Sequence, residues 1–178
     1  MEFQNNGVGV ALIDMQEGFV DRLSDSDYET LVESQICLVQ ECMKTKTPLF
    51  LMETREYGSM IDVLNREIDR DASNVAILSK RGEDGLDNLT SQLWLAHFGI
   101  DTLILTGMSA SFCVLETAQS LVHFGYRIVT ADNLIMNGWT RNPEYREHPD
   151  YLTKHQGWYT EHGVYFSEGV DPQELIRA

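Results

Sequence analysis

The sequence contains little of what a secreted or membrane-spanning protein needs. It has three cysteines in 178 residues, and its first residues lack a basic start followed by an apolar stretch. We therefore expect a reducing compartment, the cytoplasm, and no disulfide framework. No run approaches the ~18 apolar residues that a membrane-spanning helix requires. These scarcities favour a cytoplasmic globular protein.

Basic residues are scarce as well. There are 13 of them against 28 acidic residues, which gives a net charge of −15. Such a surface repels phosphate backbones and anionic lipid heads, so we expect neither a nucleic-acid nor a membrane partner. The acids are scattered rather than gathered into a tail, which is typical of a solvated surface. A small molecule is the expected partner.

Patterns that hold metals or nucleotides are missing too. The five histidines show no HxH or HxxxH spacing, so we expect no metal site. The sequence Gly7-Val8-Gly9 precedes an apolar run instead of following one, and this excludes a dinucleotide fingerprint. The sequence therefore predicts no cofactor.

What the sequence does have is an alternation of short apolar runs with longer amphipathic stretches. Predicted strands cover the apolar run 8–13 within residues 7–15, and residues 48–52, 75–78, 102–106, 126–130 and 164–166. Predicted helices cover residues 27–44, 89–98 and 114–124, with a short helix or turn-rich insert at 61–68 and a partly helical region at 138–163. Ser26 or Asp27 is expected to cap the first helix. This order predicts a single α/β domain over residues 1–178, with a mostly parallel sheet and helices on both faces.

Three reactive side chains lie at the ends of predicted strands. Asp14 follows the first strand, Lys80 follows the third, and Cys113 begins the helix after the fourth. Ligands of open α/β sheets bind at the carboxyl edge, so these residues are candidates for one site. An acid that takes the thiol proton and a cation that steadies the charges form a coherent nucleophilic set.

Cys113 is the central candidate. A thiol in the first turn of a helix meets unpaired N–H groups and the positive end of the helix dipole, which favour the thiolate. The small, polar loop 107–112 suits an oxyanion hole. By position alone, however, Cys113 is equally well explained as a small buried core residue. Asp14 as a cap and Lys80 as a surface lysine are the corresponding alternatives.

Two motifs resemble the isochorismatase-like cysteine hydrolases. The run ALIDMQEGF at 11–19 is similar to the opening of that family. The run GIDTLILTG at 99–107, followed by Cys113-Val114 and Thr117-Ala118, is similar to its second signature. The resemblance covers roughly residues 7–176, and the two motifs together are specific.

The resemblance implies a three-layer α/β/α sandwich with a six-stranded, mainly parallel sheet. It also implies a catalytic triad of Asp14, Lys80 and Cys113, and a non-proline cis peptide bond between Met108 and Ser109. The N–H groups of Ser109 and Cys113 would then face the substrate oxyanion. Family members usually form homo-oligomers, for which the aromatic-rich segment 139–165 is a candidate interface.

The chain departs from the nicotinamidase branch of this family. That branch has a metal-binding Asp-x-His motif after the second strand, where this chain reads ETREY at 53–57. The presence of Cys113 favours attack on the acyl carbon of a C–N bond in an amide, ureido or related substrate, through a thioester. Phe19 and Asp87 are candidates for substrate contact. The alternatives are isochorismatase-type vinyl-ether hydrolysis with Asp14 as the acid, and a non-catalytic scaffold with a relic site.

Overall fold

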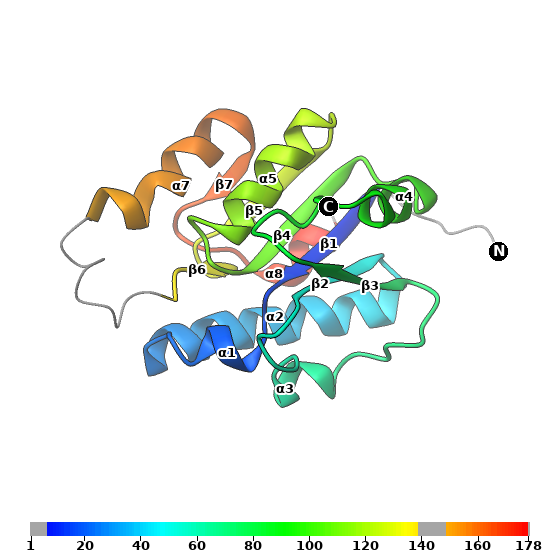
Figure 1. The fold of residues 1–178 in the computed structure, drawn as a ribbon, viewed down its shortest axis with the longest axis horizontal. Coiled ribbons are helices and arrows are strands. Elements are labelled where there is room, and N and C mark those ends of the chain that lie inside the picture. Colours follow the sequence, from blue (N-terminus) through cyan, green and yellow to red (C-terminus); the bar gives the residue numbers. More distant parts are fainter. Residues whose placement is uncertain (1–6, 139–148, 178) are drawn as a thin grey trace.

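The computed structural model describes residues 7–138 and 149–177 as an alternation of strands and helices (Figure 1). The strands are β1 (Val8–Ile13), β2 (Leu49–Thr54), β3 (Val75–Lys80), β4 (Thr102–Met108), β5 (Arg127–Ala131), β6 (Ile135–Met136) and β7 (Val164–Phe166). The helices are α1 (Glu17–Val20), α2 (Asp25–Thr45), α3 (Asp62–Asn65), α4 (Leu89–His97), α5 (Cys113–His123), α7 (Pro149–His162) and α8 (Pro172–Arg177).

The sheet is parallel, with the order β3-β2-β1-β4-β5-β7. The predicted six-stranded parallel sheet is thereby confirmed, and the two-residue strand β6 adds to it by pairing with the end of β4. The chain winds outward from β1 in one direction through β2 and β3, then returns to β4 and winds in the other direction. The order therefore reverses between β1 and β4, and the carboxyl ends of these two strands define the crevice where such folds bind ligands.

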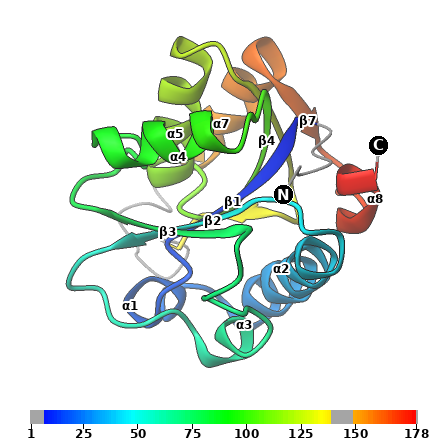
Figure 2. The same cartoon turned by 90° about the vertical axis from the view of Figure 1, so that its right-hand side faces the viewer.

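Helices cover both faces of the sheet, which gives three layers (Figures 1 and 2). The long helix α2 lies on one face with α1, α3 and α8, and the helices α4, α5 and α7 lie on the other. The central strands β1, β2 and β4 are almost fully buried, as expected for strands that are covered on both sides. No helix in the described ranges is long and apolar enough to cross a membrane.

Several element boundaries differ from the predictions. Helix α2 begins at Asp25 and is capped by Ser24, whose hydroxyl accepts a hydrogen bond from the backbone N–H of Asp27 at 3.2 Å. The prediction that Ser26 or Asp27 caps this helix was therefore wrong. Strand β3 includes Lys80, because its ladder with β2 continues to the pair Thr54 and Lys80. Of the region 138–163, residues 139–148 lie outside the described part of the chain.

Strands β1 and β4 approach each other closely at the crevice. Gly107 is paired with Ile13 and has a φ of +125°, a conformation that side chains rarely adopt. A Cβ atom at this position would collide with the carbonyl oxygen of Ile13. The glycine therefore allows the strand that leads to Asp14 to lie directly against the strand that leads to Cys113.

Candidate active site

A buried ion pair lies at the carboxyl edge of the sheet. Asp14 Oδ2 is 2.7 Å from Lys80 Nζ, and the two side chains are 0% and 1% exposed. The ammonium group also donates hydrogen bonds to the carbonyl oxygens of Gly82 at 3.0 Å and Glu83 at 3.4 Å. A buried charge is tolerated only when it is paired and hydrogen-bonded, and Lys80 has three acceptors for its three protons.

The end of β2 fixes the other oxygen of this carboxylate. Thr54 Oγ1 donates a hydrogen bond to Asp14 Oδ1 at 2.7 Å. Gln16 in turn clamps Thr54, because its amide donates to the Thr54 carbonyl at 2.9 Å and accepts from the Thr54 N–H at 2.7 Å. Asp14 also has a φ of +52°, which aspartate tolerates better than most residues. Both carboxylate oxygens are thus held in place, next to the start of α5.

Cys113 is the first residue of α5, and its side chain is 8% exposed. Burial, followed by the negative charge of Asp14, raises the pKa of the thiol to about 12. The positive charge of Lys80 acts in the opposite direction but does not outweigh them. The prediction that the helix terminus favours the thiolate was therefore wrong for the resting protein, in which Cys113 is a neutral thiol.

A neutral thiol beside a carboxylate is still suited to nucleophilic chemistry. A pKa of about 12 describes loss of the proton to water while Asp14 keeps its charge. If the proton moves to Asp14 instead, the site keeps the same net charge, and Lys80 faces one anion before and after the transfer. Creating a second buried negative charge would cost much free energy, and the internal transfer avoids it. The arrangement therefore favours deprotonation of the thiol during attack on a substrate.

The charge of Asp14 gives a testable pKa prediction. We expect Asp14→Asn to lower the pKa of the Cys113 thiol, because the substitution removes a negative charge while Lys80 stays positive. The ultraviolet absorbance of the thiolate, followed against pH in a Cys37→Ala background, measures this pKa, and the further variant Cys113→Ala supplies the blank. A pKa in the Asp14→Asn protein that equals or exceeds that of the parent would contradict the prediction.

The loop before Cys113 carries two unengaged amides. The peptide bond between Met108 and Ser109 is cis. Four neighbouring backbone N–H groups donate to protein acceptors, those of Ala110, Ser111, Phe112 and Val114. Among the described residues, the N–H groups of Ser109 and Cys113 have no protein acceptor. These are the two donors that the family resemblance implies for an oxyanion hole.

A buried polar network holds this loop from behind. The hydroxyl of Ser111 lies 2.9 Å from Nδ1 of His155 and accepts a hydrogen bond from the amide of Asn137 at 3.2 Å. The side-chain oxygen of Asn137 accepts from the Ser111 N–H at 2.9 Å. Burial lowers the pKa of His155, which favours the neutral imidazole. The network thereby ties the nucleophile loop to α7 and to the end of β6.

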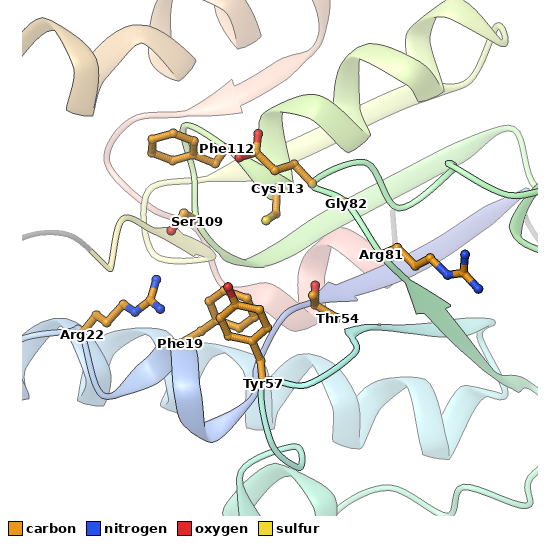
Figure 3. Close-up of a pocket in the computed structure, with 10 residues that line it drawn as sticks. Phe19, Arg22, Thr54, Tyr57, Arg81, Gly82, Ser109, Phe112 and Cys113 are labelled. Carbon is orange, nitrogen blue, oxygen red and sulfur yellow. The ribbon is translucent and has the colours of Figure 1, made fainter.

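Cys113 opens into a cavity of about 360 Å³ (Figure 3). Its lining residues come from the ends of β1 to β4 and the segments that follow them: Phe19, Arg22, Thr54, Tyr57, Arg81, Gly82, Glu83, Ser109, Phe112 and Cys113. The predicted residue Phe19 is among them. Asp87 is not, and its carboxylate instead accepts hydrogen bonds from the Arg81 N–H at 3.2 Å and the Asn88 amide at 2.9 Å. Asp87 thus stabilises the turn after β3.

Several site residues were missed from the sequence. Thr54 ends β2, so the rule that selected Asp14 and Lys80 would also have found it. Arg22, Tyr57 and His155 carry no such signal, because they reach the site through loop and helix packing. Among the described residues, no cluster of three or more histidine, cysteine, aspartate or glutamate side chains is arranged to hold a metal ion.

The structure is a three-layer α/β/α sandwich with a cysteine at the crevice between β1 and β4. The family model for the isochorismatase domain matches residues 9–148. The chain therefore belongs to the isochorismatase-like hydrolase family, as the sequence motifs predicted. A comparison of the sequence with curated proteins found no match.

Solved structures share this fold at low sequence identity. A ribonuclease from Caenorhabditis elegans, MAR1, is 16% identical with a TM-score of 0.76, over 100% of this chain and 84% of its own. A nicotinamidase from Staphylococcus aureus is 13% identical with a TM-score of 0.76, over 90% of this chain and 99% of its own. An octameric hydrolase of unknown specificity from Escherichia coli is 17% identical with a TM-score of 0.72, over 96% of this chain and 80% of its own. At these identities the likeness concerns the fold alone.

Proposed function

We propose that this protein is a cysteine-dependent hydrolase that cleaves a C–N bond in a small amide, ureido or related molecule. The observation that carries the proposal is the buried pair of Asp14 and Lys80 beside the Cys113 thiol at the wall of a cavity. In this reading Cys113 is the nucleophile, Asp14 is the base and Lys80 holds the charges in place.

The first half of the reaction forms a thioester. Asp14 takes the proton of Cys113 Sγ while the sulfur bonds to the substrate carbonyl carbon. The carbonyl electron pair moves to oxygen, where the N–H groups of Ser109 and Cys113 stabilise the oxyanion. The C–N bond then breaks, and the nitrogen leaves as ammonia or an amine with the proton that Asp14 carried.

The second half releases the acid. A water molecule occupies the place of the departed amine and gives a proton to Asp14 as its oxygen adds to the thioester carbon. Collapse of this intermediate breaks the C–S bond, and the proton returns from Asp14 to the sulfur. The site is then in its starting state. The Lys80 ammonium group stays beside Asp14 throughout and stabilises the carboxylate whenever Asp14 is ionised.

We propose that the substrate is a small molecule and not a nucleic acid, and that the reaction uses no cofactor or metal. The cavity is near the lower end of the ~300–1,000 Å³ range of ligand pockets, and the chain carries a net charge of −15. The name of the S. aureus nicotinamidase supports amide chemistry on this fold. The octameric E. coli hydrolase supports the proposal that this chain also forms a homo-oligomer.

The test is a substrate panel combined with intact-mass measurement. We expect simple amides or ureido compounds to release ammonia or an amine, and an acid quench during turnover to trap an acyl group on the protein. The added mass should map to the peptide that contains Cys113. The Cys113→Ala protein should carry no such adduct.

Two other outcomes would favour the alternatives. Turnover of isochorismate without an adduct, retained in Cys113→Ala, would favour vinyl-ether hydrolysis with Asp14 as the acid. Absence of both turnover and adduct across the panel would favour a non-catalytic scaffold. Either result would contradict the thioester mechanism.

A further inference from the structure

Ser111 is the midpoint of the segment 109–113, which carries the two amides proposed as oxyanion donors. The N–H groups of Ser109 and Cys113 lie two residues before and two residues after it. Ser111 itself is 0% exposed and is not among the residues that line the Cys113 cavity. Its hydroxyl therefore does not meet a substrate in this cavity. A displacement of Ser111, however, would move both donors.

Helix α7 contacts this segment through two consecutive residues. Nδ1 of His155 lies 2.9 Å from the Ser111 hydroxyl, and His155 is 5% exposed. Nζ of Lys154 lies 5.2 Å from the centroid of the Phe112 ring, within the range of cation–π attraction. The helix lies beside α5, on the same face of the sheet (Figures 1 and 2). The position of the segment 109–113 is therefore coupled to the packing of α7.

The contact between Ser111 and His155 is buried and polar. The Ser111 hydroxyl also accepts a hydrogen bond from the Asn137 amide at 3.2 Å, so it has two side-chain partners. The imidazole packs edge-on against the rings of Tyr159 and Tyr165, whose centroids lie 6.4 and 6.5 Å away. Buried polar groups that are hydrogen-bonded to one another favour a single arrangement of the segments that carry them. Directional contacts as well as packing thus define where Ser111 lies.

We propose that His155 is a positioning residue of the hydrolase reaction. By holding the Ser111 hydroxyl, it keeps the N–H groups of Ser109 and Cys113 directed at the oxyanion that forms during attack. Such donors stabilise an oxyanion only when they are in place before the reaction, so small displacements lower the rate. His155 does not line the Cys113 cavity and acts through Ser111 alone. This inference rests on the proposed hydrolase function and adds to it a residue outside the cavity.

The first experiment replaces the imidazole by a ring without hydrogen-bonding atoms. His155→Phe keeps the contacts with Tyr159 and Tyr165, and a second cavity of about 340 Å³ beside His155 leaves room for the larger ring. We expect kcat to fall about 10- to 100-fold while KM changes less than about threefold, because the donors act on the transition state. His155→Asn keeps a hydrogen-bonding atom near the place of Nδ1 and should retain kcat within about threefold of the parent.

Further variants separate this role from a general loss of packing. Ser111→Ala removes the other partner and should lower kcat as His155→Phe does, and the double variant should be no slower than the slower single variant. His162→Phe is the matched control, because His162 is an exposed residue of the same helix, and its kcat should stay within about twofold of the parent. Losses that multiply in the double variant, or a loss that His155→Asn shares in full, would overturn the role of His155.

A measurement without substrate separates this proposal from the hydrolase mechanism. Burial is the largest cause of the raised pKa of Cys113, so a segment released from His155 should expose the thiol and speed its alkylation by iodoacetamide. At fixed pH we expect His155→Phe to raise this rate about three- to tenfold, as a fall of the thiol pKa by about 0.5–1 unit would do. Cys42 is 0% exposed in α2, on the other face of the sheet, and its alkylation in the same sample reports unfolding of the whole protein.

The outcomes of this measurement distinguish the two proposals. Faster alkylation of Cys113 alone, in a protein whose parent turns over none of the C–N substrates, would support the hold of His155 on the segment and contradict the proposed function. Unchanged alkylation and unchanged kcat in His155→Phe would overturn the role of His155 and leave the hydrolase mechanism intact. Equal acceleration at Cys113 and Cys42 would show general unfolding and would overturn the role of His155 as well.

Discussion

Cys113→Ala is expected to lower kcat/KM for the C–N substrate by roughly 10⁴- to 10⁶-fold, the usual consequence of removing a catalytic nucleophile. The reason is that Cys113 supplies the only described thiol at the cavity wall, and a hydroxyl such as that of Thr54 is a much weaker nucleophile. Steady-state kinetics of the purified variant measure the loss. Circular dichroism and thermal unfolding should show that the fold is retained, because the substitution removes only one sulfur atom.

A second cysteine provides the control for this prediction. Cys37 is half-buried in α2 and does not line the cavity, so Cys37→Ala should leave kcat/KM within about twofold of the parent. If Cys113→Ala retains activity within about tenfold of the parent, the thiol is not the nucleophile. Chemistry that uses Asp14 without a covalent intermediate would then be the surviving explanation.

Lys80→Met should unfold at markedly lower temperature as well as lose activity. Removing one partner of a buried ion pair leaves the other charge unpaired, which costs about 3–5 kcal/mol. For a chain of 178 residues this corresponds to a fall in Tm of about 6–20 °C. The methylene stem of methionine fills most of the space of lysine, so lost packing contributes little. Urea unfolding measures the change in the free energy of unfolding, and calorimetry measures the change in Tm.

A double variant shows whether the unpaired charge causes the loss of stability in Lys80→Met. In Asp14→Asn/Lys80→Met neither charge remains, so we expect part of the lost stability to return although activity stays absent. The surface pair of Arg66 and Asp62 is the matched control, since both side chains are more than three-quarters exposed and Arg66→Met should cost less than about 1 kcal/mol. A double variant no more stable than Lys80→Met would show that the loss comes from packing instead.

The sequence predicted the parallel sheet and the strand-end residues because both follow from short-range patterns. Apolar runs define the strands, and the carboxyl ends of parallel strands meet at one edge, so Asp14 and Lys80 were expected close together; the structure places them 2.7 Å apart. Cys113 was found by the same rule. The assignment of catalytic roles to these residues stays a proposal for the experiments above.

Properties that depend on packing could not be predicted from the sequence. The position of Cys113 at the start of a helix suggested a lowered thiol pKa, but burial and the Asp14 charge raise it. The stacking of Phe19 on Tyr57 joins residues that lie 38 positions apart in the chain, through loops without a regular pattern. His155 reaches Ser111 only because α7 packs against the nucleophile loop. The pKa and both contacts depend on how helices and loops pack in the folded protein, which short-range sequence patterns do not describe.

The close approach of β1 and β4 at Gly107 has a consequence for how this fold can diversify. Asp14 and the loop that carries Cys113 are separated by hydrogen-bonded backbone, with no side chain between the two strands at that point. The main chain therefore fixes how closely the backbone at Asp14 approaches the start of the loop that carries Cys113. Cavity residues such as Arg22 and Tyr57 stand on separate loops. Changes at these loops can thus alter the cavity while the backbone pairing of β1 and β4 is kept.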